Sequence, residues 1–156
     1  MKISALALVA ALACALPAAA DPVEANAEFL ARNAKAPGVQ SLPAIQYQIL
    51  RSGPADGERP TRASTIRVRY EGRFLDGRVF NTSADGNPDG VATFALQKLI
   101  PGWIALLQQM RPGDEWRAFI PPEFAYGHRG KDTVPPNSVL VFKIELLGVS
   151  DTPPAP

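Results

Sequence analysis

Cysteine and histidine are nearly absent from this 156-residue chain, which contains one of each. A single cysteine, Cys14, cannot form a disulfide within the chain, and a single histidine, His128, cannot supply a histidine-based metal site. Nucleophilic catalysis by a Ser–His or Cys–His pair is equally unsupported, because His128 lies in a glycine-rich loop of the kind that holds solvated residues. We therefore expect no metal ion and no cofactor.

An excess of charge of either sign is missing too. Lysine and arginine together number 16 and aspartate and glutamate 15, which gives a formal net charge of +1. Nucleic acids and anionic membranes both favour a basic excess, so we expect neither as a partner. No glycine-rich phosphate motif is present, and no pair of acidic residues has the placement that glycoside hydrolysis requires.

Beyond residue 20 the chain has no apolar run as long as a membrane span. Residues 1–20 themselves combine a basic second residue, an uncharged apolar run over 3–16 and a small-residue sequence ending at Ala20, a pattern typical of a secretory signal peptide. We expect cleavage after Ala20 and export, with the periplasm as the expected compartment. An alternative is acylation of Cys14, which would attach the protein to a membrane, although Leu12 stands one place from the position that a lipobox favours.

The 16 prolines punctuate the chain and favour short strands and loops over long helices. Apolar and polar residues alternate most clearly over 65–71, and Asp76-Gly77 is typical of the two-residue turn of a hairpin. Helical spacing of apolar residues is convincing only from Pro101 to Pro112. Further strands are predicted at 45–49, 79–80, 93–96, 115–120 and 139–149.

These elements predict an α+β fold, in which an antiparallel sheet packs on one short helix. Ahead of this body, residues 21–36 have helical propensity and residues 38–43 have the composition of a linker. We accordingly divide the chain into a signal peptide (1–20), a short N-terminal helix or arm with its linker (21–43), one folded domain (44–149) and a disordered tail (150–156).

Aromatic residues are the remaining candidates for a functional site: Tyr70, Phe80, Trp103, Tyr126 and Phe142. All of them can be explained as core residues of a small sheet domain. Two placements favour a pocket instead, because Tyr126 stands in a loop beside Gly127 and Trp103 begins the helix directly after Pro101-Gly102. An aromatic and chemically inert site suits a reaction whose barrier is conformational rather than covalent.

Seven short motifs follow one another along the chain: Val68-Arg69-Tyr70-Glu71-Gly72, Asp76-Gly77, Val79-Phe80-Asn81-Thr82-Ser83, Leu99-Ile100-Pro101-Gly102-Trp103, Ala125-Tyr126-Gly127, Val134-Pro135-Pro136-Asn137 and Leu140-Val141-Phe142. Together they closely resemble the FKBP-type peptidyl-prolyl cis-trans isomerases, and within that family the exported bacterial branch typified by macrophage infectivity potentiator proteins. The match covers about residues 44–149. It implies a five-stranded antiparallel sheet wrapped around the Trp103 helix, with a pocket between helix and sheet that accepts an Xaa-Pro bond.

The resemblance also implies roles for individual residues. Trp103 would form the floor under the proline ring, and apolar walls would come from Tyr70, Phe80, Leu99, Ile100, Val134 and Phe142. The backbone N–H of Ile100 and the hydroxyl of Tyr126 would hold the substrate backbone. The catalytic residues implied are Tyr70, Phe80, Asn81, Ile100, Trp103 and Tyr126, and the substrate-binding residues are Leu99, Val134, Phe142 and Ala92.

Two positions depart from the family pattern. The family usually has aspartate where this chain has Asn81, and an aromatic wall residue is replaced by Ala92. These departures keep a second function open, a weakly catalytic or non-catalytic chaperone module that grips proline-containing segments on the same fold. The number of matching motifs favours the first function, an isomerase that assists the folding of exported proteins.

The resemblance implies proline-containing polypeptides and unfolded exported proteins as partners, and macrolides of the FK506 and rapamycin type as further ligands. Members of the exported branch often carry a long N-terminal helical dimerisation region. Residues 21–43 are too short for such a region, so we expect a monomer.

Overall fold

The structure is a computed structural model that describes residues 21–151; the predicted signal peptide, Cys14 and residues 152–156 of the predicted tail lie outside them. In chain order the helices and strands are α1 (Pro22–Asn33), β1 (Val39–Leu42), β2 (Ile45–Arg51), β3 (Thr65–Phe74), β4 (Val79–Thr82), β5 (Ala92–Ala95), the 3₁₀ turn η1 (Leu96–Lys98), α2 (Pro101–Leu107), β6 (Glu115–Ile120), the 3₁₀ turn η2 (Pro122–Phe124) and β7 (Leu140–Ser150). The architecture is α+β, as predicted. No helix in this part of the chain is long and apolar enough to cross a membrane.

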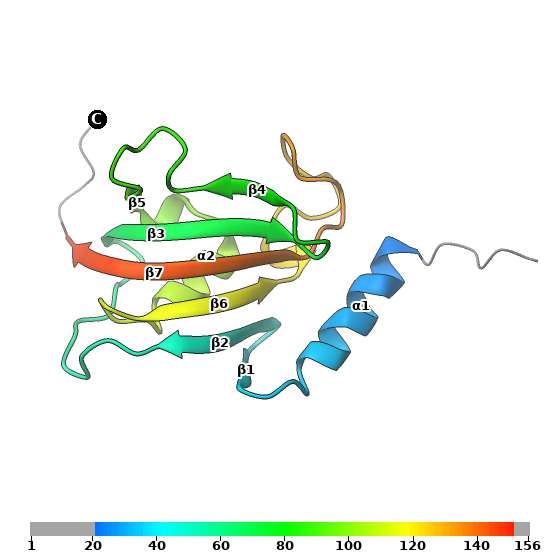
Figure 1. Cartoon of the computed structure of the whole chain (residues 1–156), viewed down its shortest axis with the longest axis horizontal. Coiled ribbons are helices and arrows are strands. Elements are labelled where there is room, and N and C mark those ends of the chain that lie inside the picture. Colours follow the sequence, from blue (N-terminus) through cyan, green and yellow to red (C-terminus); the bar gives the residue numbers. More distant parts are fainter. Residues whose placement is uncertain (1–20, 152–156) are drawn as a thin grey trace, which may run out of the picture.

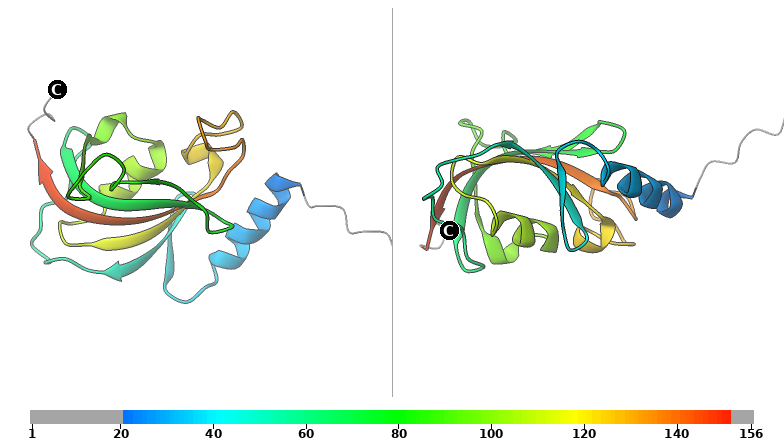
Figure 2. Two further views of the ribbon diagram at one scale, coloured as in Figure 1. Left: turned by 45° about the horizontal axis from the view of Figure 1, so that its top comes forward. Right: turned by 90° about the horizontal axis from the view of Figure 1, so that it is seen from below.

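One antiparallel sheet forms the body of the molecule, with the strand order β1-β2-β6-β7-β3-β4 and with β5 paired to β3. The long strands β3 and β7 pair from Thr65–Ser150 to Phe74–Leu140. β7 pairs with β6 on its other side and is therefore central. The twisted sheet curves around α2, as Figures 1 and 2 show.

The sheet contains seven strands, whereas five were predicted. β4 and β5 pair with different parts of the same edge of β3: β5 with residues 65–68 and β4 with residues 71–73. The two short strands thus share one edge position, separated along the chain by a loop. β1 is a further addition at the opposite edge.

The linker prediction for residues 38–43 is wrong, because β1 lies within them and pairs with β2 from Val39–Gln48 to Leu42–Ile45. β1 is an edge strand held by backbone hydrogen bonds to β2, and none of its residues is fully buried. An edge strand with so little burial has no need of a regular apolar pattern. Its sequence therefore gave no strand signal.

Helix α2 begins at Pro101, as predicted, but ends at Leu107 rather than continuing to Pro112. The N–H groups of Gln109 and Met110 donate to carbonyls three residues back, so the chain leaves the α-helix through a tighter turn. Met110 is nevertheless fully buried, which explains why its spacing resembles a helical position. The predicted tail also starts too early, since Ser150 is the last residue of β7.

The hydrophobic core lies between α2 and the concave face of the sheet. The side chains of Leu106 and Leu107 are fully buried and belong to one cluster with Ile66, Val68 and Ile144 of the sheet. This packing fixes the position of α2, and with it the first turn of the helix. That turn carries the residues that form the base of the site.

Candidate functional site

A pocket of about 420 Å³ opens between the N-terminal end of α2, the sheet and the connection from β6 to β7. Its lining includes nine of the ten residues predicted for the site: Tyr70, Phe80, Asn81, Leu99, Ile100, Trp103, Tyr126, Val134 and Phe142. These residues come from β3, β4, β7, α2 and two connecting segments. The fold therefore brings together side chains that are spread over more than seventy positions of the sequence.

Trp103 lies at the centre of the aromatic cluster. Its ring meets those of Tyr70, Phe142 and Phe94 edge to face, with centroid distances of 5.0, 5.3 and 6.4 Å. Edge-to-face contact is a favoured arrangement for aromatic pairs. The Trp103 side chain is buried, and no residue in the described part of the chain accepts a hydrogen bond from its indole N–H. Its contribution to the pocket is therefore shape and apolar contact.

The absence of a side chain at Gly72 allows the rings of Phe80 and Phe142 to contact each other in the wall of the pocket. A Cβ atom at this position would stand 2.7 Å from Cζ of Phe80 and 2.8 Å from Cε1 of Phe142. The two rings instead meet each other edge to face at a centroid distance of 5.6 Å. Any side chain at residue 72 would push them apart.

The Tyr70 hydroxyl and the Asn81 side chain form the polar edge of the wall. The hydroxyl donates to Oδ1 of Asn81 at 2.5 Å. Burial raises the pKa of Tyr70 above its usual value of 10.0, and the nearby Tyr126 and Asp85 act in the same direction. Tyr70 is thus a neutral donor at physiological pH. The amide NH₂ of Asn81 has no acceptor among residues 21–151 and remains available to a ligand.

Two more hydrogen-bond donors at the pocket have no acceptor in the described part of the chain, the backbone N–H of Ile100 and the hydroxyl of Tyr126. Ile100 is the N-cap of α2, and its own carbonyl accepts from Trp103 and Ile104 at 3.0 and 3.2 Å. The helix therefore fixes the Ile100 peptide group while leaving its N–H free. Either donor can therefore bind an acceptor of a molecule that enters the pocket.

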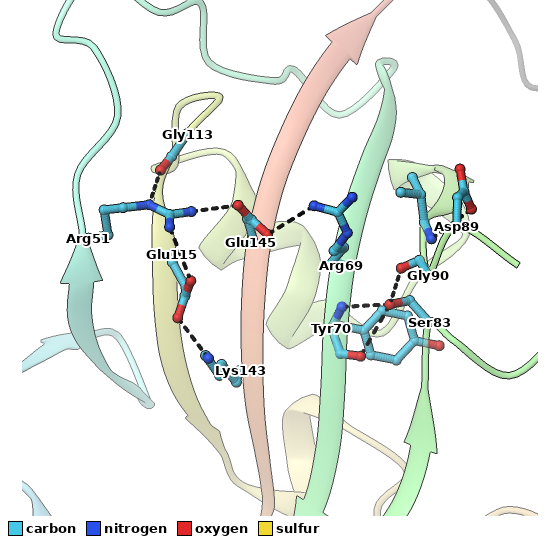
Figure 3. Close-up of polar contacts among 11 residues, drawn as sticks. Arg51, Arg69, Tyr70, Ser83, Asp89, Gly90, Gly113, Glu115, Lys143 and Glu145 are labelled. Atoms are coloured by element: carbon cyan, nitrogen blue, oxygen red, sulfur yellow. Dashed lines mark hydrogen bonds and ion pairs between the residues drawn. The ribbon is translucent and has the colours of Figure 1, made fainter. Parts of the chain in front are cut away.

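Ser83 holds the strand segment that carries Tyr70 by hydrogen bonds, which Figure 3 shows. Its Oγ accepts from the backbone N–H of Tyr70 at 2.9 Å and donates to the carbonyl of Gly90 at 2.7 Å. Ser83 is buried, so these bonds are shielded from water. Ser83 closes the motif Val79-Phe80-Asn81-Thr82-Ser83, but a motif alone does not indicate which backbone groups a serine hydroxyl will bind.

The opposite face of the sheet carries a row of alternating charges (Figure 3). Arg51 contacts Glu145 and Glu115 at 2.5 and 3.6 Å, Lys143 contacts Glu115 at 2.9 Å, and Arg69 contacts Glu145 at 3.6 Å. The cationic side chains are about half exposed, and such pairs are worth about 0–1 kcal/mol each. Strand alternation places these charges away from the pocket, which leaves the aromatic face as the candidate site.

One predicted residue is misplaced. Ala92 does not line the pocket; its methyl group lies in the hydrophobic core, and Phe94, two residues further along β5, lines the pocket instead. Residues two apart on a strand share a face, so alternation in β5 was the signal for Phe94. His128 is exposed and does not line the pocket. Four polar residues that were not predicted also lie at the rim: Lys98, Lys131, Asp132 and Thr133.

Comparisons with known proteins agree with this geometry. Residues 56–147 match the family model of FKBP-type peptidyl-prolyl cis-trans isomerases. The peptidyl-prolyl cis-trans isomerase Mip of Coxiella burnetii is 40% identical over 129 residues, which cover 81% of this chain and 54% of that protein. The outer membrane protein MIP of Legionella longbeachae is 40% identical over 124 residues, covering 78% of this chain and 51% of that protein.

A solved structure gives the same result in three dimensions. The crystal structure of a peptidyl-prolyl cis-trans isomerase from Pseudomonas syringae pv. tomato str. DC3000 matches with a TM-score of 0.76 and 36% identity, covering 83% of this chain and 93% of that chain. A curved antiparallel sheet, one short helix and an aromatic pocket between them define the FKBP-like class of fold. The chain belongs to the FKBP-type peptidyl-prolyl cis-trans isomerase family, in the branch that includes Mip. It spans about half the length of the curated relatives it matches.

Proposed function

We propose that this chain is a peptidyl-prolyl cis-trans isomerase whose pocket receives the proline ring of an Xaa-Pro bond. The observation that carries the proposal is the combination of Trp103, three edge-to-face aromatic neighbours and free hydrogen-bond donors in one pocket. Catalytic roles fall to Tyr70, Phe80, Asn81, Ile100, Trp103 and Tyr126, and Leu99, Val134, Phe142 and Phe94 complete the substrate site. Clients are proline-containing segments of unfolded proteins.

The reaction needs no proton transfer and no covalent intermediate. Rotation about an Xaa-Pro bond crosses a barrier of about 18–20 kcal/mol, because the planar amide loses its resonance at the top. The planar amide is strongly dipolar and well solvated, whereas the twisted amide has a less polar carbonyl and a more basic nitrogen. An apolar pocket therefore favours the twisted state, and each tenfold gain in rate requires about 1.4 kcal/mol of this preference.

The free hydrogen-bond donors of the pocket bind the substrate backbone. In our assignment the Ile100 N–H and the Tyr126 hydroxyl bind carbonyl groups that flank the rotating bond, so the two sides of that bond are held separately. Trp103 and Phe142 contact the proline ring. This arrangement can hold the ring still while the preceding carbonyl turns.

A protease-coupled assay on a proline-containing peptide tests the proposal directly. An isomerase accelerates the cis-to-trans phase in proportion to its concentration. The alternative function, a chaperone module with little or no catalysis on the same fold, is favoured by Asn81, which stands where the family usually has aspartate. Such a module would bind the peptide without accelerating that phase.

Asn81→Asp is expected to raise kcat/KM on such a peptide by about threefold to tenfold. The substitution turns the Tyr70 hydrogen bond into a charge-assisted one, which is roughly twice as strong and holds the wall more firmly. It also places a negative charge beside the rotating carbonyl carbon. Unchanged kcat/KM in Asn81→Asp, with Asn81→Ala also unchanged, would remove residue 81 from the catalytic environment.

The pH dependence should be flat between about pH 6 and pH 9, because no residue that lines the described pocket is a histidine or cysteine, the side chains that ordinarily titrate there. The raised pKa of Tyr70 means that the folded state keeps the phenol proton beyond pH 10.0. The stability that the protonated phenol of Tyr70 gives to the folded state is therefore complete below pH 10. It is lost as the pH rises through the pKa that Tyr70 has in the folded state. A pH profile of kcat/KM with a limb between pH 6 and pH 9 would contradict this assignment.

We further propose that the protein acts in the periplasm as a monomer. Support for export comes from the signal-peptide pattern of residues 1–20 and from the name of the Legionella relative, which is called an outer membrane protein. N-terminal sequencing of the exported form distinguishes cleavage after Ala20 from acylation of Cys14. Sedimentation measures the oligomeric state, and a binding titration tests macrolides of the FK506 and rapamycin type as ligands.

A further inference from the structure

The N-terminal helix α1 presents one half-buried face to the rest of the molecule. Asn26, Phe29, Leu30 and Asn33 are less exposed than their neighbours and follow the i, i+3, i+4, i+7 spacing of a single helix face. The Phe29 ring lies 5.9 Å from that of Phe119 in β6. α1 therefore rests against the domain although none of its residues is fully buried.

The two asparagines at the ends of this face bind different parts of the domain. Asn33 Nδ2 donates to Oε1 of Gln46 in β2 at 2.8 Å, and Gln46 in turn donates to the carbonyl of Leu30. Asn26 Nδ2 donates to the carbonyl of Asn137 at 2.5 Å, across 111 positions of the sequence. One end of α1 is thus attached to the sheet and the other to the connection between η2 and β7. Figures 1 and 2 show α1 at the end of the molecule where this connection lies.

Asn137 is the residue that closes this connection. Its N–H donates to the carbonyl of Gly127 at 2.9 Å, and its φ of 55° lies in the left-handed region. The hydrogen bond joins the segment that carries Tyr126 to the segment that carries Val134, two walls of the pocket. Asn137 therefore holds both walls from one backbone position, and its carbonyl points to α1.

We propose that Asn26 is a positioning residue, which holds the 125–137 connection, and with it Tyr126 and Val134, in the conformation that binds the substrate. The inference rests on the proposed isomerase function for its kinetic consequence. Asn26 touches no substrate atom; it acts through Asn137. A helix outside the pocket thereby sets the geometry of two pocket walls.

Asn26→Asp is the sharpest test, because it keeps the size of the side chain and replaces the donor NH₂ with an acceptor that faces a carbonyl. An aspartate near the N-terminus of α1 also leaves the helix itself intact. We expect KM for a proline-containing peptide to rise about fivefold with kcat changed less than about twofold, the effect of losing one hydrogen bond that orders a binding loop. Hydrogen exchange at the Asn137 N–H should accelerate by a similar factor.

Asn33→Ala is the control at the other end of the same helix face, since it removes the corresponding bond to the sheet without placing a negative charge at the C-terminal end of the helix. It should leave both KM and exchange at Asn137 within about twofold of the unsubstituted chain. Equal changes in the two variants would show that α1 acts only through its general attachment, and unchanged exchange at Asn137 in Asn26→Asp would equally overturn the proposal. Hydrogen exchange at Asn137 does not depend on catalysis. An unsubstituted chain without isomerase activity would therefore refute the proposed function, whereas hydrogen exchange at Asn137 would still decide the role of Asn26.

Discussion

Trp103→Ala is expected to lower kcat/KM on a proline-containing peptide by about tenfold to a hundredfold, because the proline ring loses its apolar contact surface. The free energy of unfolding should fall by about 3–5 kcal/mol, as for other buried large-to-small substitutions. The side chain is 4% exposed and meets three aromatic rings, so the cavity cannot be filled by a small shift. Peptide kinetics and denaturant unfolding measure the two losses.

Trp116→Ala separates the loss of stability from the loss of the pocket. Trp116 is 5% exposed, its indole N–H also has no acceptor within residues 21–151, and its ring stacks on Tyr47 at 4.6 Å. It does not line the pocket. We expect a similar loss of stability with kcat/KM within about twofold of the unsubstituted chain, measured well below the unfolding temperature. If Trp103→Ala and Trp116→Ala reduced activity equally, Trp103 would have no special place in the site.

Trp103→Leu is a milder variant that tests the same contact if the Trp103→Ala chain does not fold. Leucine keeps an apolar side chain over part of the pocket base and loses no hydrogen bond, since the indole N–H makes none with the described residues. Stability should therefore fall less than in Trp103→Ala, and activity should lie between that variant and the unsubstituted chain. Full activity in both variants would contradict the contact with proline.

Gly130→Ala is the second substitution with a large expected effect. A Cβ atom at Gly130 would stand 2.3 Å from the carbonyl oxygen of Val134 and 2.9 Å from backbone atoms of Pro135 and Pro136. Backbone cannot yield as a flexible side chain can, so the turn that carries Lys131 and Val134 must rearrange. We expect kcat/KM to fall by at least about tenfold and stability by about 2–3 kcal/mol, including the left-handed conformation of residue 130.

Gly90→Ala is the control for that backbone conformation. Gly90 has the same φ of 68°, but a Cβ atom there would have nothing within 4 Å. Its substitution should cost about 1 kcal/mol from the left-handed conformation alone, with kcat/KM changed less than about twofold. A Gly130→Ala variant that behaved like Gly90→Ala in both measurements would show that the turn can absorb the contact.

The elements that the sequence predicts most clearly are those whose burial is periodic. β3 alternates between buried Ile66 and Val68 and exposed Arg67 and Arg69, and α2 carries buried residues at helical spacing. β1 has no such periodicity, because backbone hydrogen bonds to β2 hold it at an edge. Met110 was predicted to be helical because it continues the spacing of the buried residues, although it lies beyond the end of the helix.

The residues of the pocket also differ in whether the sequence predicts them. Five of its aromatic members belong to motifs that occur in one order along the chain, so their convergence could be predicted by resemblance: Tyr70, Phe80, Trp103, Tyr126 and Phe142. Lys98 reaches the rim from the 3₁₀ turn η1, and Lys131 and Asp132 reach it from the connection between η2 and β7; neither segment has a periodic signature. The placement of Ala92 failed because a methyl group on β5 ends in the core, whereas the ring of Phe94 on the same face reaches the pocket.

The chain contains two tryptophans, and only Trp103 lines the pocket. A Trp116→Phe variant would retain an aromatic ring against Tyr47 and leave a single indole chromophore. Its emission would then report directly on occupancy of the pocket, without a label or a coupled protease. Equilibrium titrations of peptides and macrolides could be followed by light alone, at protein concentrations far below those that NMR requires.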